Sequence, residues 1–112
     1  MVQVETTLEL LTGWVGRASS RVYAARVVDP ATLLQRAARG HCANVRYRDP
    51  VALVEALGFR LGRVAGSHQI YVHPRIDELV SLQDVGGQAK PYQVRQVARI
   101  ALRYALPLRS RR

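Results

Sequence analysis

The sequence is short of the residues that cross-link a chain. Cys42 is its only cysteine and has no partner within the chain, which excludes an intramolecular disulfide and a cysteine-based zinc site. At 112 residues, a single main domain can bury a modest core without such support. A lone cysteine suits a reducing compartment, so we expect Cys42 to be a small, partly buried side chain of an intracellular protein.

Long apolar runs are absent as well. No run approaches the ~20 apolar residues that cross a bilayer, and the N-terminus lacks the basic-then-apolar order of a secretion signal. We therefore expect a soluble, cytoplasmic protein that does not engage a membrane.

Acidic residues are scarce. Eight Asp and Glu stand against 17 Lys and Arg, which gives a formal net charge of +9, and Lys90 is the only lysine. The planar guanidinium of arginine makes paired contacts with phosphate, so this composition favours a nucleic acid as the partner. Genomic base composition by itself also produces arginine-rich chains, and this second explanation stays open.

Several catalytic signatures are missing too. The chain has no carboxylate pair at motif spacing, no metal-ligand cluster, no Walker-type glycine loop and no Ser/His/Asp order, so neither a metal nor a cofactor is predicted. Histidine, arginine and lysine remain, and these suffice for metal-free RNA cleavage. In that reaction the substrate's own 2′-hydroxyl attacks the adjacent phosphate, a histidine transfers a proton, and cations stabilise the phosphorane.

The same Asp-Pro pair signals two helices, because Asp caps a helix N-terminus and Pro suits its first position. The first helix follows Asp29-Pro30, lies near residues 30–39 and ends at Gly40. The second follows Asp49-Pro50 and ends at Gly58. Residues 1–28 are less readable: a loose hairpin, a short helix and an extension without its own fold are all admissible.

Three strands are predicted next, over residues 59–64, 69–73 and 79–82, and their short connections make an antiparallel meander. Gly86-Gly87 then forms a flexible link to a last helix, which begins at Lys90-Pro91 and runs to about Tyr104. The order helix, three-stranded sheet, helix predicts an α+β two-layer fold with helices on one face of the sheet.

The middle strand directs its side chains alternately to the two faces of the sheet. Ile70 and Val72 share one face, which we expect to pack against the helices, and Tyr71 lies on the other. His68 is an even number of positions from Ile70 and Val72, so the alternation would place it on their face of the sheet. Because it follows the Gly66-Ser67 turn, we expect it to lie beyond the edge of the core.

The last helix carries Arg95, Arg99 and Arg103 at intervals of four residues, on a face separate from its apolar stripe. No acidic residue interrupts this row. Mutual repulsion of the three guanidinium groups would be relieved by a phosphate or an acidic partner, and plain solvation of this helix face is an equally open interpretation.

Several short motifs occur in a fixed order along the chain. They are Leu57-Gly58-Phe59-Arg60-Leu61, Gly66-Ser67-His68-Gln69-Ile70-Tyr71, His73-Pro74, Gly86-Gly87 and Lys90-Pro91. In this order they resemble the HicA family of toxin ribonucleases. The resemblance implies a double-stranded-RNA-binding-like fold. It divides the chain into an N-terminal extension at 1–43, a HicA-like domain at 44–106 and a basic tail at 107–112.

The resemblance also implies a function. A HicA-like protein is a small endoribonuclease that cleaves messenger RNA, inhibits translation and growth, and is neutralised by a HicB-type antitoxin. The Gly66-Ser67-His68 match puts the catalytic histidine at His68. Family members commonly carry a second histidine directly after the first, where this chain has Gln69. If that neighbour shares the acid–base work, its replacement impairs activity.

The cationic groups are assigned from charge alone. The candidates for binding RNA and stabilising the reacting phosphate are Arg63, Lys90, Arg95 and Arg99. Two other classes of function remain open. One is a non-catalytic module that grips structured RNA by its shape, and the other is a subunit whose basic face matches an acidic partner protein.

Overall fold

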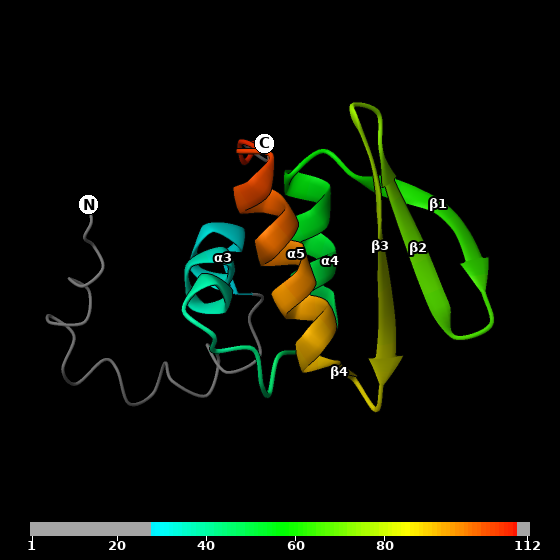
Figure 1. Ribbon diagram of the computed structural model, residues 1–112. Coiled ribbons are helices and arrows are strands. Elements are labelled where there is room, and N and C mark those ends of the chain that lie inside the picture. Colours follow the sequence, from blue (N-terminus) through cyan, green and yellow to red (C-terminus); the bar gives the residue numbers. More distant parts are fainter. Residues whose placement is uncertain (1–27, 110–112) are drawn as a thin grey trace, which may run out of the picture.

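The computed structural model describes residues 28–109, which form three helices packed on one side of an antiparallel sheet (Figure 1). The predictions for residues 1–27 and for the end of the tail, 110–112, lie outside the described residues. The elements in chain order are α3 (Pro30–Ala38), α4 (Arg48–Ala56), β1 (Arg60–Ala65), β2 (His68–His73), β3 (Ile76–Val85), β4 (Gln88–Ala89) and α5 (Pro91–Arg103). No helix in this part of the chain is long and apolar enough to cross a membrane.

Helix α3 begins where its capping signal predicts. The Asp29 carboxylate accepts hydrogen bonds from the backbone N–H groups of Ala31 and Thr32, and Pro30 takes the first helical position. After the helix, Gly40 adopts φ +91°, the left-handed conformation that commonly ends a helix. The helix predicted near residues 30–39 is therefore present.

The same signal misplaces the start of α4. This helix begins at Arg48, with Tyr47 as its N-cap, so the prediction that Asp49 caps it is wrong. Asp49 lies within the first turn, is 2% exposed, and accepts a 3.0 Å hydrogen bond from the backbone N–H of Val28. Because its carboxylate bonds to a distant segment, it is not free to cap its own helix. Its charge still lies at the favourable, N-terminal end of the helix dipole.

The sheet has four strands rather than the three predicted, in the order β1-β2-β3-β4, with every neighbouring pair antiparallel. The additional strand, β4, pairs with the end of β3 across Gly86-Gly87. Both glycines have positive φ, at 61° and 89°, which is the backbone of a tight two-residue hairpin turn. The prediction of a flexible link at these glycines is therefore wrong, while the α+β class is confirmed.

The face of β2 that meets the helices is the opposite of the one predicted. Tyr71 is 4% exposed and pairs with Val80, which is fully buried beneath the helices. Ile70 and Val72 alternate with Tyr71, so they lie on the open face of the sheet and are only partly buried. His68 shares their parity. It consequently belongs to the open face, and its position no longer conflicts with the core.

The core lies between the helix layer and β3. Its largest fully buried side chains come from every helix and from β3, and they include Leu33, Leu53, Val54, Val80, Leu82, Val94 and Val97. Helix α5 packs along β3, and α3 packs against α4 and α5 on the side away from the sheet (Figure 1). The helices do not reach β1, where all six residues are exposed.

Helix α3 belongs to this core, which yields a prediction about stability. Leu33 is 1% exposed, so Leu33→Ala should lower the free energy of unfolding by about 2–5 kcal/mol, the range for a buried leucine whose removal leaves a cavity. Leu102→Ala is the matched control, because that side chain is 62% exposed and its loss should change stability by less than about 0.5 kcal/mol. Chemical denaturation measures both, and equal effects would show that α3 is not part of the cooperative unit.

Candidate active site

His68 stands at the exit of the tight turn between β1 and β2. Gly66 and Ser67 form the two-residue loop, since Ala65 and His68 are directly paired across the strands. Gly66 has φ +62° at the first central position, the backbone for which this kind of hairpin turn requires glycine. The turn therefore fixes His68 as the first residue of β2, on the open face of the sheet.

One nitrogen of the His68 ring is held in place and the other is open. Its Nδ1 lies 2.8 Å from Oγ of Ser81, which belongs to β3 on the same open face. The serine hydroxyl either donates or accepts, so both neutral tautomers of His68 are compatible with this contact. Within residues 28–109, Nε2 makes no hydrogen bond. When Nδ1 donates to Ser81, Nε2 presents a lone pair to solvent, as a general base requires.

Hydrogen bonds between side-chain amides link the turn to α5. The amide nitrogen of Gln83 donates to Oγ of Ser67 at 3.0 Å, and its oxygen accepts from the Nε2 group of Gln93 at 3.3 Å. Gln93 is buried at 2% exposure on α5, and its oxygen also accepts the backbone N–H of Gln83 at 2.9 Å. Because Gln83 pairs directly with His68, the first turn of α5 is tied to the strand position opposite the histidine.

Of the predicted cationic residues, the structure brings Arg63 to the face that carries His68. Arg63 pairs with Ile70, two residues along β2 from His68, and paired residues share a face. Arg60 pairs with Val72 and extends the same side of the sheet. Both guanidinium groups are exposed, so the open face presents one histidine and two arginines.

Lys90, Arg95 and Arg99 lie elsewhere. Lys90 is the N-cap of α5, partly buried, with its Nζ 6.0 Å from the centre of the Tyr92 ring. Arg95 and Arg99 are exposed on α5, the helix that covers the other face of the sheet, and they are not adjacent to His68. Their assignment as RNA contacts stays a prediction.

The sequence suggested that no acidic residue accompanies the arginine row on α5, but the structure places one beside it. Arg103 forms a 2.7 Å ion pair with Glu78, which reaches it from β3, and the Tyr104 hydroxyl donates to the same carboxylate oxygen at 2.9 Å. The sequence alone does not reveal this pair, because the two residues are 25 positions apart. The row available to an outside anion is therefore reduced to Arg95 and Arg99.

Gln69 faces away from His68. Its side-chain oxygen accepts a 2.6 Å hydrogen bond from the Tyr47 hydroxyl and a 3.4 Å hydrogen bond from the Tyr71 hydroxyl, on the side of the sheet that faces the helices. Consecutive residues of a strand project to opposite faces, so this side chain does not reach the ring of His68. Gln69 instead connects β2 to the start of α4.

The hydroxyls around Gln69 are held in their protonated form. Partial burial raises the pKa of Tyr47 to about 12, and the nearby Tyr71 and Asp84 add to the shift. Burial likewise raises the pKa of Tyr71, and Glu55 raises it further. The cluster therefore remains a set of neutral hydrogen bonds throughout the physiological pH range.

Among residues 28–109, no three His, Cys, Asp or Glu side chains lie close enough together to hold a metal ion. The groups placed for chemistry on the open face are the His68 imidazole and the arginines beside it. Such a set can transfer a proton and stabilise negative charge on a phosphate.

The chain is thus a small α+β protein whose helices cover one face of an antiparallel sheet. The other face is open and carries a basic site with a histidine fixed at a turn. A family model described as the HicA toxin of bacterial toxin–antitoxin systems matches residues 47–102 of this chain. The chain therefore belongs to the HicA toxin family, and its fold is of the double-stranded-RNA-binding-like type. No curated protein and no solved structure matched the chain.

Sequence reasoning missed Ser81 and Gln83, the two residues of β3 that hold the histidine and its turn. The alternation of side chains along a strand gives their parity, but which residue stands across from His68 depends on the register between β2 and β3. That register contains an irregularity between Tyr71 and His73, which no pattern in the sequence signals.

The Tyr47 cluster predicts a specific loss of stability at alkaline pH. The pKa of Tyr47 is about 12 in the folded chain against an ordinary value of 10. Tyr47 therefore ionises at lower pH in the unfolded chain, and stability falls as pH rises from about 10 to about 12. Tyr47→Phe should reduce this fall and remove the ultraviolet ionisation step near pH 12. Tyr92→Phe, at an exposed position, should leave both unchanged. An unaltered step in Tyr47→Phe would show that another tyrosine is responsible.

Proposed function

We propose that this HicA-family protein is an endoribonuclease toxin that cleaves messenger RNA in the cytoplasm and thereby inhibits translation and growth. A HicB-type antitoxin would neutralise it. The observation that carries the proposal is the arrangement at His68, where Nδ1 is held by Ser81 and Nε2 is open on the exposed face of the sheet. Membership of a family of bacterial toxins supplies the biological setting.

The chemistry follows from the position of this one proton acceptor. Nε2 of His68 takes the proton of a ribose 2′-hydroxyl, whose oxygen forms a bond to the adjacent phosphorus. The bond from phosphorus to the 5′-oxygen of the next nucleotide breaks, and that oxygen gains a proton from solvent or from an imidazolium. The products are a cyclic phosphate and a 5′-hydroxyl end. Neither a cofactor nor a resident metal takes part in this sequence.

The second requirement is a cation that stabilises the negative charge on the reacting phosphate. The crowded phosphorane carries more negative charge than the diester, and Arg63, two cross-strand pairs away from His68, is the nearest predicted cation on that face. Lys90, Arg95 and Arg99 contribute to RNA binding at a distance from the reacting bond. The excess of arginine also suits an acidic antitoxin surface.

The departure from the family at Gln69 is compatible with this activity. A side chain on the opposite face, bonded to Tyr47, helps to position the strand and does not share the proton transfer. The competing function is a module that binds RNA without cleaving it, and a comparison of wild-type protein with His68→Ala separates the two.

His68→Ala should abolish RNA cleavage and the growth arrest caused by overexpression. The fold should persist, because the side chain lies on the open face and its loss leaves no cavity in the core. RNA affinity should also persist, since arginines carry the charge. His41→Ala, at an exposed position outside the family match, is the control and should cleave normally. An alanine variant at position 68 that cleaves at the wild-type rate would remove the catalytic assignment.

Ser81→Ala tests the support of the imidazole. Loss of the 2.8 Å contact frees the ring to rotate, so kcat should fall by roughly tenfold while the Kd for RNA stays unchanged. Ser81→Thr keeps a hydroxyl at the same position and should recover most of the rate. Single-turnover cleavage together with fluorescence anisotropy measures the two quantities, and equal rates in all three proteins would show that Ser81 does not position His68.

A further inference from the structure

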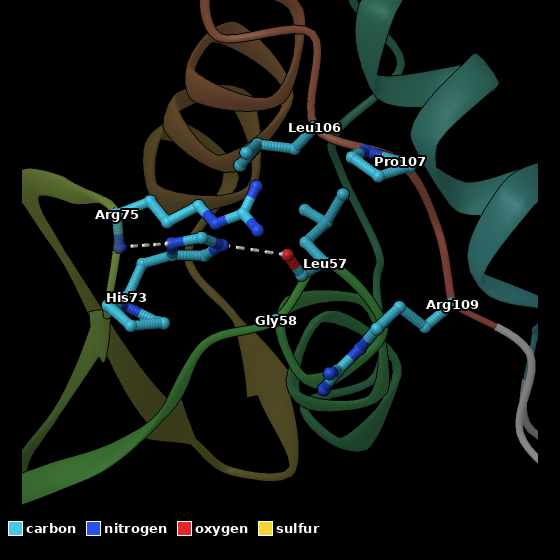
Figure 2. Close-up of a pocket in the computed structure, with 8 residues that line it drawn as sticks. Leu57, Gly58, His73, Arg75, Leu106, Pro107 and Arg109 are labelled. Carbon is cyan, nitrogen blue, oxygen red and sulfur yellow. Dashed lines mark hydrogen bonds between the residues drawn. The ribbon is translucent and has the colours of Figure 1, made fainter.

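A pocket of about 300 Å³ lies at the end of β2 opposite to His68 (Figure 2). It is formed where the turn after β2 meets the end of α4 and the segment that follows α5. The residues that line it are Leu57, Gly58, His73, Pro74, Arg75, Leu106, Pro107 and Arg109. No acidic side chain is among them, and two are arginines. The proposed ribonuclease chemistry at His68 does not involve these residues.

His73 lines the pocket and is held in place through both ring nitrogens. Nδ1 of His73 accepts the backbone N–H of Arg75 at 3.0 Å, and Nε2 donates to the carbonyl of Leu57 at 3.2 Å. Phe59 packs edge-on against the ring, with centroids 5.0 Å apart. Gly58 makes this approach possible, since a Cβ there would stand 2.8 Å from Nε2 of His73.

The two arginines are anchored by their backbones while their side chains stay available. The backbone N–H of Arg109 donates to the carbonyl of Ala56 at 2.7 Å, which fastens the C-terminal segment across the end of α4. Arg75 is anchored through its own N–H to His73. Within residues 28–109, neither guanidinium makes a hydrogen bond or an ion pair. Figure 2 shows them entering from different walls, Arg75 from the turn after β2 and Arg109 from the C-terminal segment.

We propose that this pocket binds a phosphate group of the RNA strand, several nucleotides away from the bond that His68 cleaves. The inference rests on the proposed ribonuclease function and extends its substrate site. Two guanidinium groups without a carboxylate suit a phosphate, and the apolar walls of Leu57, Leu106 and Pro107 suit the adjoining sugar or base.

A row of arginines connects the two ends of β2. Arg63 and Arg60 pair with Ile70 and Val72 on the open face, and Arg75 follows in the turn at the end of β2, where an RNA strand would pass from the open face to the pocket on the helix side. At about 3.3 Å per residue, β2 spans roughly 16 Å from His68 to His73, the strand residue that lines the pocket. An extended polyanion with a regular phosphate spacing fits such a row better than an acidic protein surface does.

The test compares two doubly substituted proteins that have lost the same charge. Arg75→Gln with Arg109→Gln empties the pocket of cations and keeps both backbone hydrogen bonds. Arg36→Gln with Arg39→Gln is the control. Both residues are exposed, Arg36 in α3 and Arg39 directly after it, and α3 lies on the side of the helix layer away from the sheet. Affinity is measured with a 2′-O-methyl RNA of about ten nucleotides. This RNA has no free 2′-hydroxyl, so it cannot be cleaved by the proposed route. Its length is sufficient to reach from His68 to the pocket, because about 5 stacked nucleotides already span roughly 16 Å.

The pocket variant should bind this RNA about tenfold more weakly than the wild type, and the control variant within about twofold. Equal affinities of the two variants would overturn the proposal. A matching loss of affinity for polyglutamate would overturn the assignment to RNA, because the site would then recognise acidic chains in general. Since the ligand is not cleaved, the result is independent of catalysis. Wild-type protein that binds but never cleaves ordinary RNA would remove the proposed function and leave the pocket result standing.

Discussion

The pairing register of β2 with β3 is the constraint on which both the core and the candidate site depend. It sets Tyr71 against Val80 and Gln69 against Leu82 on the face covered by the helices. The same register places His68 and Ser81 together on the open face. A slip by one residue would exchange the two faces, so the burial of Val80 and Leu82 is also what keeps the histidine exposed.

Two glycines with positive φ position the two histidines of β2. Gly66 makes the turn that delivers His68, and Gly58 admits His73 to within a short contact of the end of α4. The two histidines of β2 thus have opposite roles. His68 keeps one ring nitrogen open, whereas both nitrogens of His73 are occupied, which makes it a structural support beneath the basic pocket.

The arginine excess is divided among surfaces with different surroundings. Arg60 and Arg63 lie on the open face, Arg75 and Arg109 border the pocket, and Arg103 is paired with Glu78. Net charge alone predicts an anionic partner without saying where it binds. The described arginines are therefore spread over the open face, the pocket and α5, and are not gathered in one patch on α5.

The sequence by itself determined the first helix with its Asp29 cap and the turn that presents His68, because each is encoded in a few adjacent residues. It also determined the family and the α+β class, because these follow from the order of short motifs and elements along the chain. Tertiary structure decided what depends on distant residues. Asp49 bonds to Val28 and does not cap its helix, Glu78 neutralises Arg103, and Ser81 holds His68. It also decided which face of β2 is buried, since alternation defines two faces but only the helices that pack on one of them distinguish inside from outside.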